Sequence, residues 1–203
     1  HGRHWRGGMR HVKGDARRIA DMVRGMERRV ALLRGINVGG RSLPMAELRE
    51  IAAALGWNEV ATYIQSGNLL FDAPGDDADL EAALERAIER KFGFKVPIVV
   101  RTAAQLTAYL DGNPFSQAAR ETPRALLLLV PKRRPAADAQ AALEARADNG
   151  EQVGRAGDGL WIWFPNGIAR SRLSPLLIDK LVDSPATSRN WRTVKRLHEM
   201  LTE

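Results

Sequence analysis

The sequence of 203 residues contains no cysteine. Disulfide bonds, thiolate nucleophiles and cysteine-ligated metals are therefore excluded, and the composition fits a protein of the cytoplasm. No run approaches the roughly 20 consecutive apolar residues of a membrane-spanning helix. Residues 1–25 also lack the apolar segment of a secretory signal. We therefore expect a cytoplasmic protein without a membrane partner.

Histidine and the common catalytic motifs are also scarce. Three of the four histidines lie within residues 1–25, which leaves only His198. No group of histidines and carboxylates has the spacing of a metal site. The glycines do not form G-x-G-x-x-G, there is no G-K-[ST], and Ser66 lacks the G-x-S-x-G context of a nucleophile elbow. We therefore predict no metal and no cofactor, and we identify no catalytic residue.

Positive charge is concentrated at the N-terminus. The net charge of the chain is +7, and residues 1–25 hold seven Lys or Arg residues against two Asp residues. Met26 directly precedes the first predicted strand, so we interpret residues 1–25 as a basic extension that is non-native or disordered. The remaining residues carry a net charge of only +2. Nucleic acid is therefore not expected as a partner except through this extension.

Hydrophobic periodicity predicts two α/β units, at residues 26–101 and 102–203. The first unit has the strand-helix-strand-strand-helix-strand order of the ferredoxin-like plait. We expect Ser42 to cap its first helix and Pro44 to occupy the first helical position. Gly56 is expected to end this helix. The predicted strands are 30–33, 59–64, 69–71 and 97–101, and the second helix ends at Gly93.

The second unit shows a similar but incomplete order. It reads βαββα followed by a C-terminal helix, so we predict an α/β (α+β) fold of one complete and one modified plait. Thr187 or Ser188 is expected to cap the last helix. Alternation along one strand places Trp161 and Trp163 on the same face. The expected elements are helix 103–110, central strand 125–130, helix 136–147, hairpin strands 152–155 and 160–164, and helices starting at Ser174 and after Ser188.

Three stretches resemble motifs of a bacterial protein family, the domain of unknown function 1697. Residues 30–40 read VALLRGINVGG, residues 63–71 read YIQSGNLLF, and residues 186–194 read ATSRNWRTV. The resemblance extends over residues 26–201 and implies an α/β fold of plait-like units. It implies no established activity, and residues 1–25 have no counterpart in the family pattern.

Polar residues of three loops form the candidate site. A strand that passes through glycines into a helix N-terminus presents free backbone N–H groups, which favour an anion. Arg189 and Arg192 flank a second predicted helix start, so we expect the two ends of the chain to converge on one anion. The candidate ligand-binding residues are Arg34, Asn37, Gly39, Gly40, Arg41, Ser66, Asn68, Ser188, Arg189, Asn190 and Arg192.

Each of these loops also has a structural interpretation. The glycines would allow positive φ angles or close packing of the backbone. Residues 65–68 would form a turn, and Thr187 or Ser188 would cap a helix. For Arg34 the structural alternative is a salt bridge to Glu47, Glu59 or Asp72.

Four functions stay open. We prefer a binding module for a small anionic or phosphate-bearing ligand at the three loops. An enzyme at the same place would rely on Arg, Asn, Ser or Lys. Residues 167–196 carry a net charge of +5 and would suit a nucleic-acid-binding module. A homodimer or another protein interaction would use a sheet edge or the face of Trp161 and Trp163.

Overall fold

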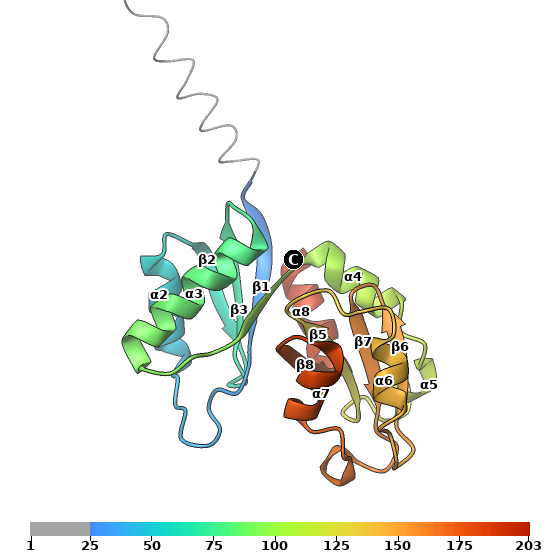
Figure 1. Ribbon diagram of the computed structural model, residues 1–203. Helices are drawn as coiled ribbons and strands as arrows, with labels where there is room; N and C mark the ends of the chain where they lie inside the picture. Colours follow the sequence, from blue (N-terminus) through green and yellow to red (C-terminus); the bar gives the residue numbers. More distant parts are fainter. Residues whose placement is uncertain (1–24) are drawn as a thin grey trace, which may run out of the picture.

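Two four-stranded antiparallel sheets form the framework of the protein (Figure 1). The structure is a computed structural model, and it describes residues 25–203. The basic extension predicted for residues 1–25 lies outside the described residues, apart from Gly25. Within the described part of the chain, every helix is too short or too polar to cross a membrane.

The first sheet has the strand order β2-β3-β1-β4 of a ferredoxin-like plait. β1 lies inside the sheet and pairs antiparallel with β3 and β4, while β2 forms the edge beside β3. The order βαββαβ confirms the sequence prediction for this unit. Its elements are β1 (Glu27–Leu33), α2 (Met45–Ala54), β2 (Asn58–Tyr63), β3 (Asn68–Ala73), α3 (Asp77–Phe92) and β4 (Ile98–Thr102).

The second sheet repeats this topology with the order β6-β7-β5-β8. Its edge strand β8 pairs with β5 and completes a plait that sequence analysis described as incomplete. The sequence of β8, ATSRN, lacks the apolar alternation that marks a strand, so its residues were assigned to a helix cap. The elements are β5 (Leu126–Pro131), α6 (Ala139–Glu144), β6 (Gln152–Ala156), β7 (Gly159–Trp163), α7 (Pro175–Val182) and β8 (Ala186–Asn190).

Three α-helices and one 3-10 helix lie outside these two plait units. The predicted caps of two helices are wrong. Asn190 caps α8 by accepting a hydrogen bond from the backbone N–H of Thr193 at 3.0 Å. Pro44, and not Ser42, occupies the N-cap of α2 and leaves it without a side-chain cap. The additional helices are α4 (Ala103–Asp111), α5 (Ser116–Glu121), which was not predicted, η1 (Ile168–Arg170) and α8 (Trp191–Thr202).

Apolar side chains pack in three layers, because each sheet is buried on both faces. α2 and α3 cover the outer face of the first sheet, and α6 and α7 cover the outer face of the second. The middle layer joins the inner faces of both sheets through α4 and α8, which lie between the two units in Figure 1. Along β1, Ala31 and Leu33 pack in the outer layer while Val30 and Leu32 pack in the middle layer. Separating the two plaits would therefore expose apolar surface of both.

The two tryptophans of β7 belong to the middle layer, opposite Leu160 and Ile162, as the alternation predicted. Trp161 is fully buried, and its ring packs against Trp191 of α8 with centroids 5.3 Å apart. Trp163 remains partly exposed. The two side chains therefore do not form an exposed face for a partner, contrary to one of the sequence hypotheses.

A buried ionic cluster connects β4 to the second plait. The guanidinium of Arg101 donates from Nε to the hydroxyl of Tyr109 and from Nη2 to the carbonyl of Pro131, both at 2.8 Å. The same Nη2 lies 3.4 Å from Oδ2 of Asp158, and the other carboxylate oxygen, Oδ1, accepts a hydrogen bond from the hydroxyl of Tyr109. Because Arg101 lies on the first plait while Pro131 and Asp158 lie in the second unit, the cluster fixes the position of one sheet edge against the other unit.

Glu81 of α3 extends this cluster along the edge strand β4. Its Oε1 accepts a hydrogen bond from the backbone N–H of Val100 at 2.9 Å, and its Oε2 lies 3.4 Å from Nζ of Lys132. Desolvation raises the pKa of Glu81, although the hydrogen bond from Val100 and the charges of Lys132 and Arg101 oppose this rise. Glu81 thereby covers an edge N–H group that would otherwise be open to another strand.

We predict that Glu81 makes stability depend on pH in a defined direction. Its pKa in the folded chain lies above the usual value of a glutamate, so the folded chain holds this proton more tightly than the unfolded chain. The contribution of Glu81 to stability is therefore greatest at low pH and falls as the pH rises through the folded pKa. Urea denaturation of wild type and Glu81→Gln from about pH 4 to about pH 8 measures it. The wild-type advantage should shrink with rising pH, and a growing advantage would contradict the assignment.

Candidate functional site

Arg189 of β8 extends across to the first plait and joins the three family-like motifs. Its Nε donates to Oδ1 of Asn68, and its Nη2 donates to the carbonyl of Leu33, both at 2.7 Å. We call Arg189 and its acceptors the Arg189 junction. The remaining acceptors are the carbonyls of Ser66, Gly67 and Ser188 and Oγ1 of Thr187, at 3.3, 3.1, 2.8 and 2.8 Å.

The electrostatics of the junction are unusual for an arginine. Among residues 25–203, no carboxylate forms a salt bridge with Arg189, although the side chain is largely desolvated by its acceptors. Burial lowers the pKa of Arg189 to about 10, well below the usual range of an arginine. Six oxygen acceptors satisfy all three guanidinium nitrogens, so the charge is stabilised by dipoles rather than by a counter-ion.

Two asparagines hold the acceptor side of the junction. Asn68 is fully buried, and its Nδ2 donates to the carbonyl of Tyr63 at 2.8 Å, which directs its Oδ1 toward Arg189. Asn37 ties the glycine loop to the hairpin, because its Nδ2 donates to the carbonyl of Gln65 at 2.7 Å. The hairpin tip therefore lies between the glycine loop and β8. The side chains of both asparagines form hydrogen bonds within the protein.

Arg34 belongs to a different contact from the one that the sequence suggested. Its Nη1 donates to Oδ2 of Asp179 on α7 in the second plait. The structural partners proposed from sequence, Glu47, Glu59 and Asp72, are wrong, because the actual carboxylate is far away in the chain and is brought close by the packing of the two plaits. Like Arg189, Arg34 joins the end of β1 to the second unit.

Gly39, Gly40 and Arg41 lie apart from the junction. Together with Asn37 and Ser42 they line an open hollow of about 260 Å³ in the glycine loop. Arg41 donates to the carbonyl of Lys95 at 3.4 Å and lies 5.8 Å from the ring centroid of Phe94. The eleven predicted residues therefore do not form one site. Ser188 and Asn190 stay on β8, one as an acceptor of Arg189 and the other as the cap of α8.

Arg192 turns away from Arg189 and lines a second hollow, of about 300 Å³, between α5 and α8. Arg196 in this hollow is paired with Glu199 at 3.3 Å and with Glu203 at 2.9 Å. Arg192 and Lys195 form no ion pair within residues 25–203. The lining residues are Ala119, Pro123, Trp191, Arg192, Lys195, Arg196 and Glu199.

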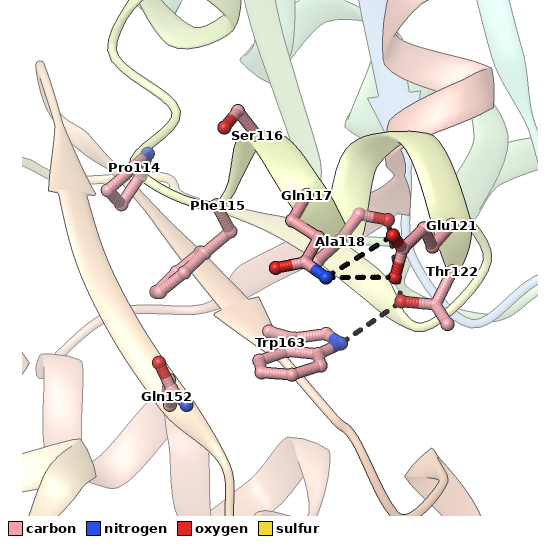
Figure 2. Close-up of a pocket in the computed structure, with 9 residues that line it drawn as sticks. All are labelled: Pro114, Phe115, Ser116, Gln117, Ala118, Glu121, Thr122, Gln152 and Trp163. Atoms are coloured by element: carbon pink, nitrogen blue, oxygen red, sulfur yellow. Dashed lines mark hydrogen bonds between the residues drawn. The ribbon is translucent and has the colours of Figure 1, made fainter.

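A third hollow, of about 480 Å³, was missed by sequence analysis (Figure 2). It lies between α5 and the strands β6 and β7, and it is lined by Phe115 and Trp163. The available signal in the sequence was the pair of aromatic residues Trp163 and Phe115, of which Phe115 follows Asn113 and Pro114. None of the described residues forms a cluster of His, Asp or Glu suited to a metal ion.

Fold and junction define a protein of two tandem ferredoxin-like plaits, joined at the loops that carry the family-like motifs. Residues 26–161 match the model of DUF1697, described as proteins of unknown function, and the chain belongs to this family. The chain is similar to the conserved bacterial protein SP0830 from Streptococcus pneumoniae, with 26% identity and a TM-score of 0.70, over 88% of this chain and 99% of that chain. No curated protein matches it. The family resemblance inferred from the motifs is confirmed.

We predict that Gly67 tolerates a side chain less well than Gly40. Both have positive φ, +89° and +82°, so alanine strains the backbone at either position. A Cβ at Gly67 would lie 2.5 Å from Cδ1 of Ile36 and 2.9 Å from Cβ of Leu33, whereas Gly40 has nothing within 4 Å. Gly67→Ala should therefore cost about 1–3 kcal/mol more than Gly40→Ala in urea denaturation. Equal losses would show that the space around Gly67 adjusts freely.

Proposed function

We propose that the protein is a cytoplasmic binding module for a small anionic or phosphate-bearing ligand in the hollow between α5 and α8. The observation that carries this proposal is the pair Arg192 and Lys195, which line this hollow and form no ion pair within the described residues. Two cations three residues apart lie on the same helix face, so both charges are available to one ligand.

The position of the two cations on the helix adds to their attraction for an anion. Arg192 lies in the first turn of α8, a helix of twelve residues, where the aligned peptide dipoles favour negative charge. The guanidinium of Arg192 supplies a planar pair of donors that matches carboxylate or phosphate oxygens. Glu199 also lines the hollow and offsets the charge of Arg196, so the net positive charge of the lining residues is that of Arg192 and Lys195.

Trp191 supplies an apolar wall beside these charges. Its ring is held by Trp161, at an interplanar angle of 52°, and it also lines the hollow. Because a fixed indole offers contact area at little entropic cost, a ring or sugar attached to the anionic group would gain from contact with it. This arrangement favours a phosphate-bearing ligand with a flat organic part over a bare inorganic ion.

The other cations of the predicted site are less suited to a ligand. Every guanidinium nitrogen of Arg189 already donates to protein oxygens, and Arg34 is paired with Asp179. The glycine loop with Arg41 is the second location for the same class of ligand, because the side chain of Arg41 is exposed and forms no ion pair within residues 25–203.

Thermal unfolding with phosphate, and separately with adenosine monophosphate, tests the proposal. Binding to the folded state raises the melting temperature, by about 4 °C at a ligand concentration of about ten times Kd. Chloride at matched ionic strength controls for screening. The test variant is Arg192→Gln with Lys195→Gln. The matched control is Arg41→Gln in the glycine loop together with Lys95→Gln, whose carbonyl accepts a hydrogen bond from Arg41.

We expect both anions to raise the wild-type melting temperature, with the larger rise for the nucleotide. The rise should disappear in the Arg192/Lys195 variant and persist in the Arg41/Lys95 variant. The opposite pattern would move the ligand to the glycine loop and overturn the assignment to α8. A wild-type protein that does not respond beyond chloride would overturn the proposed function itself.

A further inference from the structure

The hollow of Figure 2 differs from the α8 hollow in both charge and shape. α5 contributes to both, with Ala119 on the cationic side and Gln117 and Glu121 on this side. In Figure 2 the rings of Phe115 and Trp163 project into the same space, and Gln152 of β6 closes the rim beyond them. Its volume of about 480 Å³ is within the usual range for small-molecule sites.

The aromatic walls of this hollow are fixed in place. The indole N–H of Trp163 donates to Oγ1 of Thr122 at 3.1 Å, which orients the ring. The backbone N–H of Phe115 donates to Oδ1 of Asn113 at 2.9 Å. Pro114 packs so closely on Gly154 that a Cβ atom at Gly154 would overlap the proline ring. Because the two aromatic side chains are already ordered, a ligand binds them with little further loss of side-chain conformational entropy.

Charge in this hollow has a single sign. Of the nine lining residues only Glu121 is charged, although the chain as a whole has a net charge of +7. The carboxylate of Glu121 accepts two hydrogen bonds from Nε2 of Gln117, both at 3.2 Å, and it forms no salt bridge within residues 25–203. An anionic ligand would therefore be repelled here, whereas a cation would meet an unpaired carboxylate and two aromatic faces.

We propose that this hollow binds a small organic cation, with a quaternary ammonium or guanidinium head placed between Phe115 and Trp163 and near Glu121. Aromatic faces attract such cations through their quadrupole, most strongly at tryptophan, and a nearby carboxylate adds direct charge attraction. A hydrated metal ion does not fit this arrangement, because one carboxylate and two amide side chains lack the ligand number that such ions require. The site is independent of the anion-binding hollow.

The test compares choline with dimethylbutanol, its neutral carbon isostere, on the full chain. Titration calorimetry measures affinity, and the nuclear magnetic resonance signal of the Trp163 indole N–H reports the location. Choline should bind at least about tenfold more tightly than the neutral isostere, because only choline gains from the charge and the aromatic faces. Equal affinity of the two probes, or no movement of the Trp163 signal, would overturn the proposal.

Variants assign the attraction to individual groups. Glu121→Gln keeps an exposed polar side chain and should weaken choline by about tenfold without changing the binding of the isostere. Trp163→Leu should weaken both probes. The matched control is Glu199→Gln, which removes a carboxylate of α8 from the other hollow and should leave choline binding unchanged. If Glu121→Gln binds choline as well as wild type does, the proposal fails. Retained stabilisation by phosphate in Glu121→Gln separates this result from the anion site.

Discussion

The guanidinium of Arg189 is the contact on which the arrangement of the two plaits depends. It connects the edge strand of the second sheet to the end of β1 and to the hairpin tip of the first. A half-buried cation without a carboxylate partner is costly, and the cost is offset because all three of its nitrogens donate to oxygen acceptors. This requirement explains the neighbouring residues: Asn68 orients one acceptor, and Gly67 leaves room for Ile36 beneath the turn.

The shared middle layer makes the two plaits one structural unit. Strands of both sheets bury their inner faces against α4 and α8, so neither plait has a complete core by itself. The Arg101 cluster and the pair of Arg34 with Asp179 add polar contacts at the rim of this layer. Both proposed ligand sites lie beside α5 or α8, the helices added to the plaits. The two plaits thus support the added helices, and these helices contribute charged and aromatic side chains to the proposed ligand sites.

Sequence predicted those parts of the structure that follow from local periodicity. The first plait, the central strand β5 and the opposite orientation of Trp161 and Leu160 all come from apolar patterns that reflect one buried face. β8 could not be predicted because its sequence lacks alternating apolar residues. Its polar side chains instead contact a hairpin that is distant in the sequence.

The candidate site was less accessible to sequence reasoning. The three motifs meet at Arg189, as the expected convergence of residues distant in the chain requires. Their polar groups form hydrogen bonds with one another, however, and are not left open to a ligand. Arg192 lies only three residues further and faces a separate hollow, because the chain passes from a strand into a helix at Trp191. The partner of Arg34 and the two aromatic walls around Glu121 depend on packing between elements far apart in sequence, which no local pattern encodes.

Urea denaturation of Arg189→Met tests the structural role of this junction most directly. Methionine keeps an unbranched apolar stem but removes one donor from each acceptor of Arg189, so the free energy of unfolding should fall by about 3 kcal/mol or more. Arg41→Met, an exposed arginine on the glycine loop, should change the free energy of unfolding by less than about 0.5 kcal/mol. A loss at Arg189 as small as that at Arg41 would contradict the central role assigned to this side chain.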